Sequence, residues 1–315
     1  MIRIAITGTG AVSPAGWGTP ALHEAIRTGR RAEPSPIPRI GGDGTVPGYR
    51  VPPPPGRLPF LRHPRLRRAS PVARYALAAT LEALGEARAA SIGDGTLRCG
   101  VVFTVMNACV TYSGRFFAEV LENPPTASPI LFPETVFNAP ASHISAFLGS
   151  PAPNDTLVGD EATYFVGLDL AAQWLADREV DACLVIGAEE IDPVTVEGAS
   201  VTGARQPLSE GAGAVLLERS GHSPPAVELA RVTDAVPYLT SRAAALAAVL
   251  GQLTEPGDLV GNVPEAQADC ARLFGNALGA AAALNVVAAT GRDRDARTVC
   301  AGSNQQAAGA LIKFH

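Results

Sequence analysis

Residues 155–219 constrain the fold most, because short apolar runs alternate there with a long apolar helix. The pattern predicts strands at 155–159, 182–191 and 211–219, and a helix at 162–177. Buried strands that alternate with helices are typical of α/β folds, in which helices cover the faces of a sheet. The sequence therefore predicts an α/β chain with mostly parallel sheets.

The same alternation continues on both sides of this block, and it restarts after residues 222–225. We therefore expect two halves of related design, residues 1–222 and 223–315. The proline-rich stretch 31–59 is expected to be an irregular surface excursion, and the glycines after the first strand predict a turn. Further strands are expected at 2–7, 100–105, 226–233, 258–262, 297–302 and 308–314, and helices at 19–29, 71–90, 113–121, 139–148, 240–252, 264–274 and 276–290.

Composition narrows the class of protein. Hydrophobic residues make up 47% of the 315 residues and charged residues 17%, which excludes a disordered chain. The net charge of −5 offers no reason to expect nucleic acid or an anionic membrane as partner. Neither a signal peptide nor an apolar run of about 18 residues is present, so we expect a cytoplasmic protein.

The five cysteines are scattered without CxxC spacing. An odd number of cysteines within apolar runs predicts buried free thiols, and favours neither a disulfide framework nor a zinc site. We accordingly expect no metal and no cofactor.

Several motifs, in order along nearly the whole chain, resemble the β-ketoacyl synthase family of the thiolase superfamily. They are IAITGTGAVSPAGWG, RHPRLRRASPVARYALAATLEAL, FPETVFNAPASHISAFLG, DTLVGDEATYFVGLDLAAQWL followed by DACLVIGAEE, PLSEGAGAVLLE, FGNALGAAAALN and CAGSNQQAAGALI. The resemblance implies a thiolase-like fold, a five-layer αβαβα sandwich of two related halves. It also implies a dimer that pairs the strands preceding the nucleophile helix of each subunit.

A condensing enzyme of this family needs a cysteine at the start of the nucleophile helix and two histidines from the second half. By the resemblance, Glu161 takes the cysteine position, and Asn276 and Val260 take the histidine positions. No cysteine lies between residues 110 and 182, and no histidine between 223 and 314, so no shift of the alignment restores the site. Condensation by this chain alone is therefore not expected.

Glu161 allows two interpretations. A carboxylate at the start of the helix at 162–177 would cap it, as could Asp160 beside it, and this interpretation is favoured. The alternative is a mimic of an acylated cysteine that permits decarboxylation, but the histidines that would assist are missing.

Other polar residues are more often structural. Asn276 and Asn262 could bind a ligand carbonyl, although asparagine at such places is usually a cap or turn residue. Cys300 is expected in the core. Glu189 and Glu190 are adjacent on a strand and should point to opposite faces.

The resemblance implies the role of a chain-length-factor-like subunit in type II polyketide biosynthesis, in pathways of the highly reducing or polyene kind. Such a subunit forms a heterodimer with an active ketosynthase, within a 3-oxoacyl-carrier-protein synthase complex, and helps to bound the acyl tunnel. Two alternatives stay open: a decarboxylase or acyltransferase that uses Glu161, and a homodimeric binder of an acyl carrier or acyl ligand.

Two sets of residues follow from this interpretation. An acidic acyl carrier protein would dock transiently on the one basic cluster, which is otherwise a solvated face. The cluster comprises Arg57, Arg62, Arg65, Arg67 and Arg68, of which the last four are the docking candidates. The residues expected at the tunnel and the subunit interface are Phe132, Phe137, Asn138, Ala141, Ile144 and Thr163.

Overall fold

The computed structural model describes residues 2–201, 206–221 and 223–315. Its strands are β1 (Arg3–Ser13), β2 (Gly16–Trp17), β3 (Ser35–Pro38), β4 (Thr45–Gly48), β5 (Cys99–Val105), β6 (Asn154–Val158), β7 (Ala182–Glu189), β8 (Gly211–Ser220), β9 (Val227–Val232), β10 (Val236–Pro237), β11 (Asp258–Gly261), β12 (Ala296–Ala301) and β13 (Gln306–Phe314). Its α-helices are α1 (Thr19–Thr28), α2 (Pro71–Gly93), α3 (Val110–Glu122), α4 (Ala139–Leu148), α5 (Thr163–Ala176), α6 (Pro193–Val201), α7 (Arg242–Gln252), α8 (Ala271–Phe274) and α9 (Ala281–Thr290). Short 3₁₀ helices are η1 (Pro59–Arg62), η2 (Pro64–Arg68), η3 (Pro124–Thr126), η4 (Phe132–Glu134) and η5 (Leu278–Ala280).

A large mixed sheet forms the frame, in the order β11-β12-β13-β9-β1-β8-β7-β5-β6. Among the strands that the structure describes, apart from isolated bridges, parallel pairing is confined to β11–β12, β5–β6 and β5–β7. The expectation of mostly parallel sheets was therefore wrong. The reason lies in the connections: a short turn joins β12 to β13, and α6 leaves the sheet instead of crossing over it, so β13 and β8 return antiparallel.

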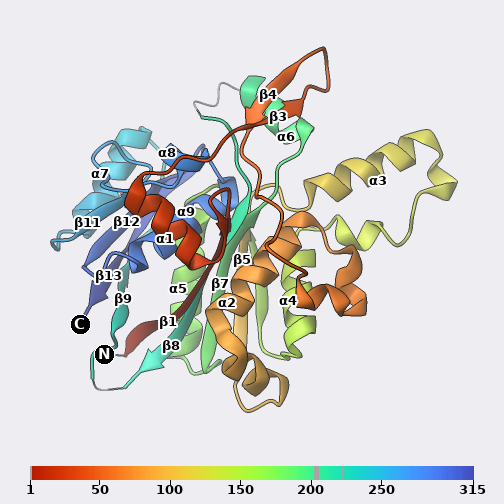
Figure 1. The fold of residues 1–315 in the computed structure, drawn as a ribbon. Helices are drawn as coiled ribbons and strands as arrows, with labels where there is room; N and C mark the ends of the chain where they lie inside the picture. The colour runs from red at the N-terminus through yellow and green to blue at the C-terminus, as the bar shows by residue number, and fades with distance from the viewer. Residues whose placement is uncertain (1, 202–205, 222) are drawn as a thin grey trace.

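Helices and the two parts of the sheet alternate in five layers, as expected for a thiolase-like fold (Figure 1). Helices α2 and α4 cover the outer face of the part of the sheet built from β1, β8, β7 and β5. Helices α5 and α9 lie between that part and the part built from β9, β13, β12 and β11, whose outer face α7 covers. The two parts join where Ala5 of β1 pairs with Glu228 of β9.

The expected boundary between the halves, at residue 222, lies outside the described residues. The parts of the chain before and after residue 222 contribute different strands and helices to the layers. The first half supplies β1, β5 to β8 and α5, whereas the second half supplies β9 to β13 and α9. The central layer therefore contains one helix from each half.

Strand β1 is longer than predicted, because Gly8 and Gly10 lie inside it instead of forming a turn. Helix α2 packs so closely over these glycines that a Cβ atom on either would lie 1.9 Å from the carbonyl oxygen of Ala83 or Ala79. The glycines therefore permit a close approach of helix and strand.

Two predicted helices of the second half are shorter than expected. In place of a helix over residues 264–274, only α8 forms, because Ala268 bridges to Val260 and accepts a hydrogen bond from Gly261 N at 2.9 Å. Helix α9 starts at Ala281, not at residue 276, because Asn276 bridges to Leu208. In both places, pairing with a distant backbone competes successfully with the local helix.

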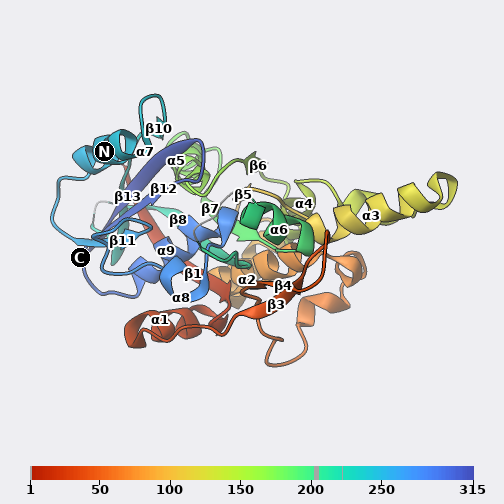
Figure 2. The ribbon, with the colours of Figure 1, turned by 90° about the horizontal axis from the view of Figure 1, so that it is seen from above.

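The stretch 31–59, expected to be irregular, contains the β3–β4 hairpin, which lies beside α6 above one end of the sheet (Figures 1 and 2). Ile37 of this hairpin packs with Ile191 and Val196 in a small separate core. Among the described helices, none has the length and apolarity needed to cross a bilayer.

Candidate functional site

The structure brings Glu161 and Asn276 together, although 115 residues separate them in sequence. Glu161 lies between β6 and α5 and is buried. Its carboxylate accepts hydrogen bonds from Asn276 Nδ2 at 2.7 Å, from Ser303 N at 2.7 Å, and from the Ser303 hydroxyl. Ser303 follows β12, so three distant segments meet at this one carboxylate.

The predicted cap at Glu161 was wrong. The first residues of α5 have no side-chain cap, and the Glu161 carboxylate turns away from the helix towards Ser303 and Asn276. Its two oxygens accept three hydrogen bonds from donors on two distant segments, which accounts for the direction of the side chain.

Asp160, next to Glu161 in sequence, binds the same turn between β12 and β13. Its carboxylate accepts hydrogen bonds from Gln305 N at 2.9 Å and Gln306 N at 3.3 Å, and from Ala162 N at 3.2 Å. A Cβ atom on Gly302 would lie 2.1 Å from Asp160 Oδ2, so only glycine fits there. Burial, and then the nearby Glu161, raise the pKa of Asp160 above its ordinary value.

Asn276 is fixed on both sides by its backbone. Its N–H donates to Pro207 O at 2.9 Å, and its carbonyl accepts from Ser209 N at 2.8 Å. Its side-chain oxygen accepts from Leu278 N at 2.9 Å, which is the turn role expected from the sequence. The side-chain amide is thereby aimed at Glu161.

The other candidate residues, Val260, Asn262 and Cys300, have structural surroundings. Val260 lies buried in β11, and Asn262 exchanges two hydrogen bonds with the backbone of Ala301, at 2.8 and 2.9 Å. Cys300 is buried as expected, and burial, followed by the charges of Glu161 and Asp160, raises the pKa of its thiol well above the ordinary value.

The hydrogen bonds of the Glu161 carboxylate are all made within this chain. Glu161 contacts Asn276 and Ser303, and none of the histidines that the structure describes reaches it. Both of its oxygens are engaged by these three hydrogen bonds, and none of the five cysteines is exposed as a nucleophile. The geometry supports a closed, structural carboxylate more than a catalytic one.

Replacing Glu161 with alanine should lower the free energy of unfolding by about 1.5–3 kcal/mol, which is the contribution of one hydrogen bond to a charged group. The half-buried Asn276 loses its acceptor, whereas the exposed Ser303 can donate to water instead. Urea unfolding measures the loss, and alanine at the exposed Glu179 is the control. A loss equal to that control would contradict the contact network.

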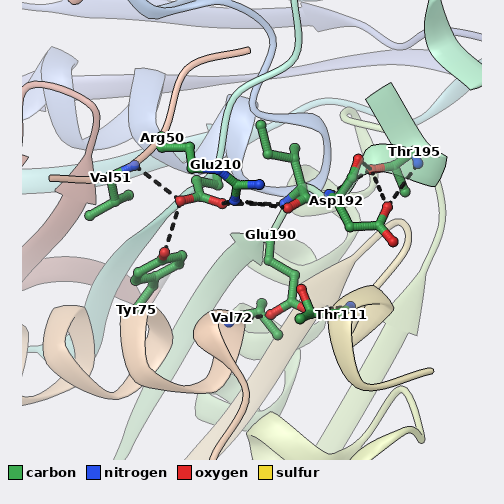
Figure 3. Close-up of polar contacts among 10 residues, drawn as sticks. Arg50, Val51, Val72, Tyr75, Thr111, Glu190, Asp192, Thr195 and Glu210 are labelled. Atoms are coloured by element: carbon green, nitrogen blue, oxygen red, sulfur yellow. Dashed lines mark hydrogen bonds and ion pairs between the residues drawn. The ribbon is translucent and has the colours of Figure 1, made fainter. Parts of the chain in front are cut away.

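Three further glutamates, Glu189, Glu190 and Glu210, lie where β7 ends and β8 begins. Only the first two were considered from the sequence. Glu189 accepts hydrogen bonds from Met106 N and Ala108 N at 2.9 Å, and from Gly279 N at 3.2 Å. Glu190 accepts from the N–H groups of Val72 in α2 and Thr111 in α3 (Figure 3). The two adjacent side chains serve opposite sides of the strand, as expected.

Glu210 was not singled out from the sequence. It accepts hydrogen bonds from Tyr75 Oη at 2.9 Å and from Val51 N at 3.1 Å, and it pairs with Arg50 at 3.1 Å (Figure 3). It therefore holds the excursion at 31–59 against the sheet. Sequence reasoning missed it because its partners come from a segment that was expected to be irregular.

The buried pair should make stability depend on pH. Burial raises the pKa of Glu189 to about 8 and that of Glu190 to about 7, from 4.5. A raised folded pKa stabilises the fold below the unfolded pKa, and this contribution is lost as pH rises through the folded value. The unfolding free energy of wild type relative to Glu189→Gln should therefore fall between about pH 5 and about pH 8. Urea titrations across this range measure it, and a constant difference would contradict the assignment.

The residues expected at the tunnel and interface separate into two groups. Phe132 and Phe137 are 55% and 45% exposed, and Asn138 is exposed as well. Ala141 and Ile144, in contrast, are fully buried in this chain's own core, because they face α2 and β5. In this chain alone they belong to the core, and their place at the tunnel or interface stays a prediction.

Thr163, the sixth of these residues, is also buried. Its hydroxyl accepts a hydrogen bond from Gln306 Nε2 at 3.4 Å, and a Cβ atom on Gly159 would lie 2.2 Å from this oxygen. Thr163 therefore links α5 to β13 within the chain.

Strand β6 forms one edge of the sheet, and no described strand pairs with its outer side. Val101 N donates to Pro153 O at 3.0 Å and Gly159 N donates to Val105 O at 3.1 Å, so the odd-numbered residues of β6 face β5. The peptide groups of Asn154, Thr156 and Val158 consequently face outwards. Thr156 N–H donates to the Asp155 side chain at 2.8 Å. The edge has free pairing capacity beside exposed apolar side chains.

The arginines of the basic cluster are exposed, with Arg57 before η1, Arg62 on η1, and the other three on η2. Arg65 and Arg68 line a groove of about 440 Å³ together with Asn138 and His143. The structure thus places part of the candidate docking set next to part of the candidate interface set.

The family model described as β-ketoacyl synthase, N-terminal domain, matches residues 58–222, slightly more than half of the chain. No curated protein matches the sequence.

Solved structures share the fold over nearly the full length. "The ishigamide ketosynthase/chain length factor" has 18% identity and a TM-score of 0.80, with 99% of each chain covered. A type II PKS acyl-carrier protein in complex with its ketosynthase (AntDE:AntF) has 14% identity and a TM-score of 0.80, covering 100% of this chain and 99% of that one. The ketosynthase ApeO in complex with its chain length factor ApeC, from Xenorhabdus doucetiae, has 14% identity and a TM-score of 0.77, covering 100% and 98%. Since the family model spans most of the first half and the fold agrees throughout, this chain belongs to the β-ketoacyl synthase family.

Proposed function

We propose that this chain is a non-catalytic, chain-length-factor-like subunit that forms a heterodimer with an active ketosynthase in type II polyketide biosynthesis. Its own carboxylate, Glu161, fills the position of the nucleophile, and Asn276 and Ser303 saturate it. The chain therefore contributes surface and shape to a complex, and the partner contributes the chemistry.

The observation that carries the proposal is the open edge of β6 beside exposed apolar side chains. Val158 at the end of β6, Phe132 and Phe137 before α4, and Phe117 and Leu121 on α3 are all exposed. Exposed apolar groups next to an unpaired strand are typical of a protein interface. Two of the similar solved structures are described as a ketosynthase with a chain length factor, which supports a ketosynthase as the partner.

Co-expression with candidate ketosynthases, followed by co-purification, tests this proposal. We expect a stable one-to-one complex with a ketosynthase that carries the Cys-His-His set, and product only from the complex. A soluble homodimer that binds no ketosynthase would instead favour an acyl-carrier or acyl-ligand binding protein. Decarboxylation by the isolated chain would favour the enzyme alternative.

An acyl carrier protein is the second partner that we propose. One similar solved structure contains an acyl-carrier protein bound to its ketosynthase, and Arg65 and Arg68 here face a groove beside the proposed interface. A guanidinium pair in such a groove would attract the acidic face of a carrier protein.

Reversing both charges, Arg65→Glu with Arg68→Glu, should weaken binding of the carrier protein to the reconstituted complex by about tenfold at low salt. The effect should shrink as salt is added, because screening acts on exposed charges. Arg294→Glu, beside β11 at the opposite edge of the sheet, is the control. Equal weakening by the control would place the docking site elsewhere.

A further inference from the structure

Helix α3 leaves the body of the molecule with no side chain of its own buried (Figures 1 and 2). Together with the segment that returns to α4, it forms what we call the apolar arm, residues 110–137. Within the arm, the rings of Phe116 and Phe132 lie 5.4 Å apart, and the Ser113 hydroxyl donates to Thr135 O at 3.3 Å. The arm thus has internal contacts, but its helix has no packed face that would fix its direction against the body.

Two buried glutamates, Glu189 and Glu190, connect the start of α3 to the body of the molecule instead. Glu189 accepts the backbone N–H groups of Met106, Asn107 and Ala108, three of the four residues that lead from β5 to α3. Glu190 accepts the N–H of Thr111, the second residue of α3, at 2.8 Å. Every residue of the entry to the arm except Cys109 and Val110 therefore donates to one of two adjacent glutamates.

Glu190 also ties the arm to a second helix. Its other oxygen accepts the N–H of Val72, the second residue of α2, at 2.8 Å (Figure 3). The N–H groups of a first helical turn lack partners within the helix, so they need acceptors from elsewhere in the chain. One carboxylate thus satisfies the N-termini of both α2 and α3, and so fixes one helix relative to the other.

The bend before α3 is a second, independent indication. Ala108 adopts a left-handed backbone with φ of 60°, which is unfavourable for alanine. Its N–H donates to Glu189 at 2.9 Å, so the carboxylate holds the strained residue at the point where the chain turns into the arm.

We propose that Glu189 and Glu190 are positioning residues that set the direction of the apolar arm, and with it the shape of the surface offered to the partner. This proposal rests on the proposed function for the identity of the partner, an active ketosynthase. Its structural part, the direction of α3, concerns the isolated chain alone.

Hydrogen exchange of the isolated chain provides the first measurement. In Glu190→Gln, one of the two acceptors becomes an amide donor, so at least one helix loses its contact. We expect amides of residues 110–122 to exchange about tenfold faster or more than in wild type. Helix α2 should change less, because the Ser70 side chain also caps it.

Glu210→Gln is the matched control, since Glu210 is equally buried in the same region but contacts Arg50, Val51 and Tyr75 rather than α3 (Figure 3). It should leave the exchange of residues 110–122 at the wild-type rate. Equal acceleration in both variants, or no acceleration in Glu190→Gln, would overturn the positioning role. Should Glu190→Gln fail to fold, Glu190→Asp, whose shorter side chain cannot reach both helices, replaces it.

Affinity for the ketosynthase provides the second measurement. We expect Glu190→Gln to weaken the complex about tenfold and Glu210→Gln to leave it unchanged. Equal affinities of Glu190→Gln and wild type would overturn the link between the arm and the partner. A wild-type chain that binds no ketosynthase would overturn the proposed function, while the exchange experiment would still decide whether the glutamates hold α3.

Discussion

Replacing Thr156 with proline is expected to weaken the complex with the ketosynthase by about a hundredfold or more, without unfolding the chain. The N–H of Thr156 faces away from β5, so proline removes no hydrogen bond between β5 and β6. Proline is tolerated in an edge strand whose N–H faces solvent, but it deprives a pairing strand of a donor and adds a ring where that strand would lie.

Thr156→Val is the control, because it changes the side chain and keeps the donor. Analytical ultracentrifugation of mixtures with the ketosynthase measures complex formation, and circular dichroism verifies the fold. A Thr156→Pro chain that still binds as tightly as Thr156→Val would show that the partner does not add to the sheet at β6.

Truncating Phe137 to alanine is expected to shift the products of the reconstituted complex towards longer acyl chains. Phe137 is 45% exposed, so its ring is available to a partner's tunnel and its loss opens space there. Each further methylene that is buried gains about 0.8 kcal/mol, so a growing chain should extend until it meets a wall. Mass spectrometry of the products measures the shift.

Because the ring of Phe137 is half-exposed, its truncation should cost little stability. A buried phenylalanine would cost about 3–5 kcal/mol on truncation, whereas a half-exposed one should cost much less. Tryptophan at Asn138, which is exposed, should shorten the products, but a large residue at the buried Ala141 should destabilise the chain instead. Leu239→Ala, at an exposed position between β10 and α7, is the control. Parental product lengths in Phe137→Ala and Asn138→Trp would leave only a scaffolding role.

The elements that sequence patterns predict best are those whose cause is local. Strands β5 and β7 are continuous apolar runs and are buried throughout, and α2 begins at Pro71, where proline is favoured. Gly8 and Gly10 were interpreted as a turn because only the distant Ala79 and Ala83 reveal why glycine is needed there.

The candidate site shows the same limit. A carboxylate before a helix is locally a cap, and only the fold brings Ser303, 142 residues away, to Glu161. In α4, whose sequence APASHISAFL is apolar on most sides, periodicity did not distinguish Ala141 and Ile144, which face the core, from residues that face outwards. The resemblance located the segment, and packing decided the role of each residue.

The burial of all five cysteines has a practical consequence for a mixed assembly. Burial raises the pKa of the Cys99 and Cys109 thiols to about 12, and those of Cys183, Cys270 and Cys300 well above the ordinary value. An electrophile that alkylates thiolates would find almost none on this chain at neutral pH. In the proposed heterodimer, such a reagent would label the ketosynthase and leave this chain unlabelled, so the reactive cysteines of the partner could be counted.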